Sequence, residues 1–144
     1  MKIYVASSFL NKDAAREMQD LLKRYGHEIT YDWTQHPSST DWGIFREECK
    51  KDLQGIVDAD ALVVVLPGRL GTASELGIAL ALDKLVFVWY PDVPTMQATL
   101  DNSVFWHHIN VWITDDAIRL VQELEYAQEE LVYVRGSKAI PTEA

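Results

Sequence analysis

The sequence has few cysteines, few basic residues and no long apolar run, and each shortage argues against a class of protein. Its one cysteine, Cys49, has no second cysteine to pair with, so we expect no internal disulfide and a cytoplasmic location. The longest apolar runs, such as residues 61–66, are far too short to cross a bilayer. The first residues lack the charged, apolar and small-residue order of a signal peptide, so we expect no membrane partner.

The charge balance is acidic, with 13 Lys and Arg against 22 Asp and Glu, for a formal net charge of −9. A nucleic-acid polymer is bound by basic surfaces that displace counterions, so we expect no such partner. A mononucleotide is still compatible with this charge, because backbone N–H groups and one arginine can hold a single phosphate. Histidine and cysteine spacings typical of zinc sites and acidic loops typical of calcium sites are missing, so we expect no metal and no cofactor.

Strand and helix patterns alternate along the chain, which has 144 residues, 48% of them hydrophobic, and fits one core. Strands are predicted at residues 2–6, 27–33, 61–66, 85–90 and 110–113, and helices at residues 11–26, 44–57, 72–82 and 115–131. This order predicts a single-domain α/β fold with a doubly wound (flavodoxin- or Rossmann-like) five-stranded parallel sheet flanked by helices. We expect the domain to span residues 1–134 and residues 135–144 to form a loose tail.

Ligands of such sheets bind beyond the carboxyl ends of the strands, where the strand order reverses. The rule selects the segments that follow the predicted strands: residues 7–9, 32–36, 67–72 and those after residue 91. In the first two segments the candidate substrate-binding residues are Ser7, Ser8, Phe9, Trp33 and His36. A structural interpretation is open for each, because serines also form turns, aromatic rings also fill cores and loop histidines are also solvated.

The segment with the most information is residues 66–77, LPGRLGTASELG, in which a glycine-bearing turn joins a buried strand to a helix. Gly68 and Gly71 let the backbone approach a ligand, and the helix beginning at about Thr72 presents N–H groups to an anion. Glu75 lies one turn into that helix, either in the site or in a capping box with Thr72. Arg69 is either a phosphate clamp or an exposed loop cation.

Two blocks, KDLQGIVDADALVVVL at residues 51–66 and GTASELGIALALDK at residues 71–84, resemble the nucleoside 2-deoxyribosyltransferase family, which includes related deoxynucleotide N-hydrolases. The similarity runs from residue 2 to about residue 113. It implies that Glu75 is the catalytic nucleophile and that Asp52 is a second catalytic carboxylate that handles the base or sugar. By position alone, a solvated helix carboxylate is the more common interpretation of Asp52. Asn102 resembles a position that reaches a neighbouring subunit's site, which implies a homodimer or larger homo-oligomer.

The resemblance implies cleavage of the N-glycosidic bond of a nucleoside or nucleotide through a covalent glycosyl-Glu75 intermediate, in nucleotide salvage. It favours deoxyribosyl transfer between bases. A departure keeps a hydrolase of nucleoside 5′-monophosphates open: transferases often carry an acidic residue before the Gly–Thr step, where this chain has Gly68, Arg69 and Leu70. That loop is also similar to the loop on which cytokinin-releasing phosphoribohydrolases hold a 5′-phosphate. The third alternative is a non-catalytic nucleotide sensor on the same fold.

Overall fold

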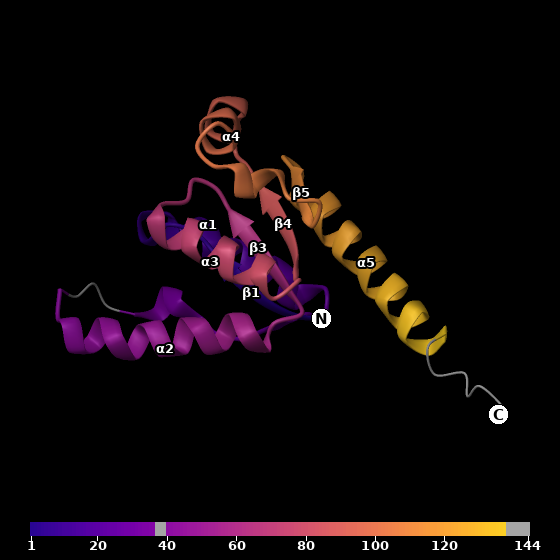
Figure 1. The fold of residues 1–144 in the computed structure, drawn as a ribbon, viewed down its shortest axis with the longest axis horizontal. Coiled ribbons are helices and arrows are strands. Elements are labelled where there is room, and N and C mark those ends of the chain that lie inside the picture. Colours follow the sequence, from indigo (N-terminus) through magenta and orange to yellow (C-terminus); the bar gives the residue numbers. More distant parts are fainter. Residues whose placement is uncertain (37–39, 138–144) are drawn as a thin grey trace.

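Five parallel strands form the sheet at the centre of the computed structural model, which describes residues 1–36 and 40–137 (Figure 1). The strands are β1 (Lys2–Ala6), β2 (Glu28–Ile29), β3 (Ala61–Val65), β4 (Leu85–Trp89) and β5 (Val111–Thr114). Their order is β2-β1-β3-β4-β5, and every neighbouring pair is parallel. The predicted five-stranded parallel sheet is therefore confirmed.

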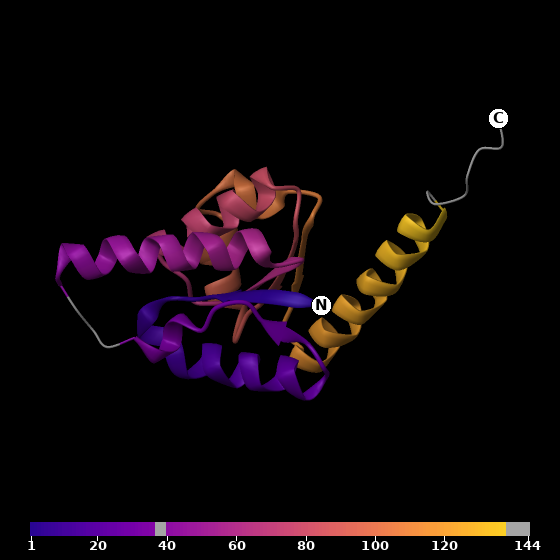
Figure 2. The same cartoon turned by 90° about the horizontal axis from the view of Figure 1, so that it is seen from below.

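Helices cover both faces of this sheet. They are α1 (Lys12–Arg24), α2 (Trp42–Asp58), α3 (Leu70–Ala81), α4 (Val93–Leu100) and α5 (Ala117–Ser137). The buried side chains of α1 and α5 join one core cluster and those of α2 and α3 the other, and Figure 2 shows α1 and α2 on opposite sides of the sheet. In both views the C-terminal part of α5 extends away from the sheet. The helix includes residues 135–137, and the rest of the proposed tail, 138–144, lies outside the described residues.

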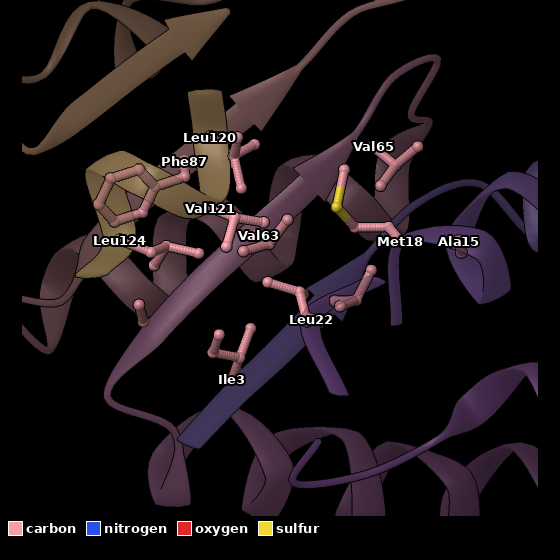
Figure 3. Packing of buried hydrophobic residues seen from close by; sticks show 12 residues of the cluster. Ile3, Ala15, Met18, Leu22, Val63, Val65, Phe87, Leu120, Val121 and Leu124 are labelled. Atoms are coloured by element: carbon pink, nitrogen blue, oxygen red, sulfur yellow. The ribbon is translucent and has the colours of Figure 1, made fainter. Parts of the chain in front are cut away.

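Side-chain alternation along the strands divides the core into two clusters. All five residues of β3 are buried, as expected for a β-branched strand with helices on both faces. In β1, Ile3 and Val5 point toward α1 and α5, whereas Tyr4 and Ala6 point toward α2 and α3. Figure 3 shows the first cluster, in which side chains from α1 and α5 meet those of β1, β3 and β4. Each large side chain buried there contributes roughly 1.5–3 kcal/mol to folding.

Strand β2 is much shorter than the predicted 27–33, because a local hydrogen bond redirects the chain after Thr30. The Thr30 N–H still donates to Ile3 O, at 3.0 Å, but the Asp32 carboxylate then accepts from the Thr34 N–H at 3.0 Å. This contact begins a 3₁₀ turn, η2 (Trp33–Gln35), where the extended strand was expected. The turn brings the Trp33 indole N–H to Val5 O, at 2.6 Å.

Helix α3 begins at Leu70, two residues before the expected start. Thr72 is therefore inside the first turn, where its Oγ1 accepts from the Arg69 N–H at 3.3 Å. Gly68 is needed in this turn, because a Cβ there would lie 2.6–2.9 Å from the Thr72 side chain. The other boundaries differ from the expected ones by a few residues, and the segment after residue 91 contains α4 and a 3₁₀ turn, η3 (Val104–His107).

The strand order reverses between β1 and β3. The chain leaves β1 toward α1 on one face and leaves β3 toward α3 on the other, so a crevice opens at their carboxyl ends. Among the helices of residues 1–36 and 40–137, none combines the length and the apolar character that crossing a membrane requires.

Candidate active site

A cavity of about 490 Å³ lies at this crevice, within the size range of small-molecule sites. Its wall combines the ends of β1 and β3, the turn after β2, one face of α2 and the first turns of α3. The lining residues are Tyr4, Ser7, Ser8, Phe9, Leu10, Trp33, His36, Ile44, Phe45, Glu48, Asp52, Arg69, Gly71, Thr72 and Glu75. The structure therefore brings together all the residues predicted from the sequence except Gly68 and Asn102.

Glu75 faces this cavity from the second turn of α3. Because the helix begins early, Thr72 is not the cap, and its hydroxyl is bonded to the Arg69 N–H rather than paired with Glu75 in a capping box. The capping-box interpretation of Glu75 is therefore wrong. Its Oε2 atom is buried and has no hydrogen-bond partner in the described part of the chain. A buried acceptor without a donor is costly, and such atoms are typical of sites that bind a ligand.

Burial raises the pKa of Glu75 from its usual value near 4.5 to about 8. This value includes two smaller effects: a hydrogen bond with the Tyr4 hydroxyl lowers the pKa, and the nearby negative charge of Asp52 raises it. At neutral pH this carboxyl therefore carries a proton for most of the time. Its carboxylate form is weakly solvated, which favours attack on a carbon centre once the proton is lost.

Tyr4 connects the two carboxyl groups of the site, and the sequence analysis missed it. Its hydroxyl donates to Asp52 Oδ1 at 3.0 Å and also contacts Glu75. Burial and the two carboxylates raise the Tyr4 pKa far above its usual range, so the hydroxyl stays protonated as a donor. Two signals in the sequence point to this role: a buried tyrosine needs a polar partner, and position 4 shares a strand face with Ala6, toward α2 and α3.

Asp52 comes close to Tyr4 because α2 approaches β1 at a glycine. A Cβ on Gly55 would lie 2.9 Å from Tyr4 Cδ2 and 2.9 Å from Tyr31 Cβ. Asp52 is half-buried in the cavity wall rather than on the solvated face of its helix. Burial is the largest cause of its raised pKa, which the Tyr4 hydrogen bond partly offsets. Gly55 therefore permits the approach that places a second carboxyl beside Glu75.

The two serines after β1 line the cavity, but their hydroxyls also stabilise the turn. Ser7 Oγ donates to Val65 O at 2.7 Å and accepts from the Asn11 amide at 3.0 Å. Ser8 Oγ accepts from the Leu10 N–H at 3.3 Å. The Ser7 hydroxyl therefore has both a donor and an acceptor partner, while Ser8 keeps its proton for a further acceptor.

Aromatic side chains form the apolar part of the wall. Trp33 is fixed by its bond to Val5 O and packs against both core clusters, so it belongs to the core and the cavity at once. Phe9 and Phe45 are exposed, with Lys12 Nζ 5.2 Å from the centre of the Phe9 ring. Exposed aromatic rings at a cavity are suited to stacking on a flat ligand.

Glu48 is a second residue of the wall that the sequence analysis missed. It lies one turn before Asp52 on α2, so the two carboxyl groups share a helix face. Glu48 Oε2 accepts from the Tyr31 hydroxyl at 2.7 Å and lies 2.7 Å from His36 Nε2. The four-residue spacing from Asp52 was the signal in the sequence that could have found it. His36, predicted in the site, therefore reaches the cavity with a carboxylate partner.

The loop before α3 separates this cavity from a second one of about 530 Å³. Arg69 is exposed and lines both cavities, whereas Gly68 and Asn102 line only the second. Asn102 is therefore outside the site of its own chain. Its proposed role concerns a neighbouring subunit and stays a prediction.

Comparison with known proteins agrees with this geometry. The nucleoside 2-deoxyribosyltransferase family matches residues 3–131. The structure is similar to the 2-deoxyribosyltransferase of Bacillus psychrosaccharolyticus, with a TM-score of 0.60 and 21% identity, over 84% of this chain and 90% of that chain. The CMP N-glycosidase BcmB of Clostridium botulinum gives a TM-score of 0.51 and 18% identity, over 88% and 99% of the two chains.

A comparison with curated proteins finds no significant match. At these sequence identities, the two solved structures establish only the fold. The family assignment rests on the match over residues 3–131. The chain, an enzyme of glycosyl transfer or hydrolysis, belongs to the nucleoside 2-deoxyribosyltransferase family.

Proposed function

We propose that this enzyme cleaves the N-glycosidic bond of a nucleoside or nucleotide, with Glu75 attacking the anomeric carbon. The observation that carries the proposal is the unpartnered Oε2 of Glu75 in the wall of a cavity, beside Tyr4 and Asp52. A carboxylate next to a sugar can trap the oxocarbenium-like transition state as a covalent ester.

In the first step, Glu75 forms a bond to C1′ while the bond from C1′ to the base nitrogen breaks and its electron pair leaves with the base. Asp52 is the candidate donor of the proton that the departing base takes up, because it is the second carboxyl group of the cavity wall and is bonded to the Tyr4 hydroxyl beside Glu75. Tyr4 holds the two carboxyl groups in position. In the second step, a new acceptor attacks C1′ and releases Glu75, so the sugar configuration is retained overall.

The acceptor decides between the two activities. The family match favours transfer to a second nucleobase, in which case the product is a new nucleoside. The guanidinium of Arg69, as a group that could bind a 5′-phosphate, favours the second candidate, which is hydrolysis of a nucleoside 5′-monophosphate. Within the described ranges the structure gives Arg69 no carboxylate within 4 Å, and it lies beside Gly71 at the start of α3, where helix N–H groups attract anions.

We further propose a homo-oligomer. The stretch around Trp106 was open to a core or an interface interpretation, and its side chains divide between the two: Trp106 is buried, whereas Val104, Phe105 and Ile109 are exposed. These exposed apolar side chains follow Asn102, the residue expected near a neighbouring site. Sedimentation equilibrium tests this proposal, and a monomer at all concentrations would contradict it.

The experiment that tests the activity compares deoxynucleosides with their 5′-monophosphates, with and without a second free base, by chromatography of the products. New nucleosides indicate transfer, and free base released only from monophosphates indicates hydrolysis. Glu75→Gln is the blank, and Ser74→Ala, at an exposed hydroxyl bonded to Leu70 O, is the matched control in the same helix. No turnover of any substrate by the wild type would refute the proposal and favour a nucleotide sensor.

A further inference from the structure

Glu48 is held in one orientation by residues outside its own helix. Its Oε2 atom accepts from the Tyr31 hydroxyl and lies against His36 Nε2, both at 2.7 Å, and the rings of Tyr31 and His36 are 5.6 Å apart. Burial and the hydrogen bond to Glu48 both raise the pKa of Tyr31, which keeps its hydroxyl a donor. Two partners on one oxygen fix the carboxylate rotamer before any ligand arrives.

The other oxygen of Glu48 is not bonded in the same way. Lys51 Nζ forms an ion pair with Oε1 at 3.6 Å, a distance longer than a hydrogen bond, and the Lys51 side chain is half exposed, so a ligand group can replace it. Among the described residues no donor is bonded to this oxygen. The arrangement therefore leaves one acceptor, attached to a fixed carboxylate, in the wall of the cavity.

Glu48 lies farther from the reaction centre than Asp52. Asp52 is bonded to the Tyr4 hydroxyl, which also contacts Glu75, whereas Glu48 lies one helical turn earlier on α2 and is held by Tyr31 and His36. The three carboxyl groups therefore follow one another along the wall. With the sugar at Glu75 and the leaving base at Asp52, the outer edge of the base would lie toward Glu48, beside the apolar side chain of Phe45.

We propose that Glu48 is a specificity-determining residue that selects nucleobases with an exocyclic amino group, as in cytosine and adenine, over bases with a carbonyl oxygen in its place. The inference rests on the proposed function. A carboxylate only accepts hydrogen bonds, so it binds an amino group and repels a carbonyl lone pair. Because a site built to hydrogen-bond a substrate group discriminates strongly against an analogue that lacks it, we expect a preference of at least about tenfold.

The test uses pairs of nucleosides in which a carbonyl oxygen replaces the exocyclic amino group and the adjacent ring nitrogen gains a proton. The pairs are deoxycytidine against deoxyuridine and deoxyadenosine against deoxyinosine, each as the nucleoside and the 5′-monophosphate. We expect the wild type to favour the amino member of each pair in kcat/KM. Glu48→Gln keeps the size of the side chain and adds an amide donor that can bind a carbonyl, so it should reduce or invert both ratios. Glu47→Gln is the matched control, because Glu47 is exposed and pairs with Lys50 at 3.1 Å.

Two outcomes would overturn the proposal. Ratios that Glu48→Gln leaves unchanged would show that Glu48 does not contact the base. An equal loss for both members of a pair would assign Glu48 only to holding Tyr31 and His36.

A binding measurement separates this proposal from the proposed function. Dissociation constants of the same ligands, measured by calorimetry with Glu75→Gln and with the Glu75→Gln, Glu48→Gln double variant, require no turnover. If the wild type cleaves none of the substrates but the amino preference in binding depends on Glu48, the proposed function fails and the inference holds. If cleavage is observed and neither binding nor kcat/KM depends on Glu48, only the inference fails. Binding of neither member of a pair would also refute it.

Discussion

The two ends of the sheet each hold a titratable group with a buried, unpartnered atom, and they differ in what surrounds it. At the carboxyl ends of the strands, Glu75 lines a cavity with Tyr4 and Asp52. At the opposite end, His27 Nε2 is buried without a partner in the described chain, while Nδ1 lies 3.0 Å from the Met1 amino group. Burial raises the pKa of Glu75 and lowers that of His27, because it disfavours the charged form of each.

Burial therefore makes the contributions of Glu75 and His27 to folding stability change in opposite directions with pH. For Glu75 the folded state binds more protons than the unfolded state between pH 4.5 and about 8, so stability falls as pH rises through that window. For His27 the unfolded state binds more protons just below its usual pKa near 6.5, so stability falls as pH decreases there. We propose that the stability lost by burying the Glu75 carboxyl serves catalysis, because its cavity contains further polar groups that a substrate can contact.

The largest effect is expected for Glu75→Gln. Without the proposed nucleophile, kcat should fall by at least about a thousandfold. Stability should rise instead, because the amide has no charge to bury, and the gain over the wild type should grow from pH 5 to pH 8.5. Steady-state kinetics and thermal unfolding across that pH range measure both. A variant that is inactive but equally stable at every pH would contradict the burial argument.

Tyr4→Phe should have the next largest effect. Its loss leaves Asp52 Oδ1 without its donor and removes the hydroxyl that contacts Glu75, so we expect kcat/KM to fall by about 10²-fold. Because this hydroxyl lowers the pKa of Glu75, the rising limb of the kcat/KM profile, expected near pH 8 in the wild type, should move to higher pH. An unchanged limb together with lower activity would assign Tyr4 to packing alone.

Much of the fold and the place of Glu75 at the strand ends could be predicted from the sequence because their signals are local, whereas Asp52 was predicted only through the family resemblance. The apolar, valine-rich run at 61–65 specifies the central strand, and the glycine-bearing turn after it places Glu75 near the strand ends. The edge strand β2 was overestimated, because Asp32 begins a turn inside an otherwise β-rich segment. The start of α3 was misplaced because Thr72 was interpreted as the cap.

The residues that the sequence did not reveal depend on contacts between distant segments. Tyr4 and Asp52 are 48 positions apart, and Tyr31 and Glu48 are 17 apart. Both contacts depend on how closely α2 packs against β1 and the chain after β2, which Gly55 permits. Hydrophobic periodicity indicates which face of an element is buried, but it does not give the distance between two packed elements.

Two helical glycines can be compared in the same way: Gly55 shapes the cavity wall, and Gly77 does not. A Cβ on Gly55 would lie 2.9 Å from both Tyr4 and Tyr31, so Gly55→Ala should destabilise the protein by about 1–3 kcal/mol and lower activity. Gly77 in α3 has nothing within 4 Å of such a Cβ, and Gly77→Ala should stabilise by about 0.5–1 kcal/mol. Urea unfolding measures both. Equal effects of the two substitutions would refute the close-approach argument.

The smallest effect is expected at the opposite end of the sheet, for His27→Asn. The wild type should lose stability as the pH falls from about 7 to 5, because His27 has to gain a charge in a buried position. Asparagine keeps an acceptor for the Met1 amino group but has no charge to gain, so the variant should lose less stability over that range. The difference should be at most about 1 kcal/mol in the free energy of unfolding.

Urea unfolding at pH 5 and pH 7 measures this difference. Because His27 lies at the end of the sheet opposite the cavity, activity at neutral pH should be unchanged. If the wild type and the variant lose equal stability between pH 7 and pH 5, the buried imidazole does not cause the loss at acid pH. The two ends of the sheet would then no longer differ in their response to pH.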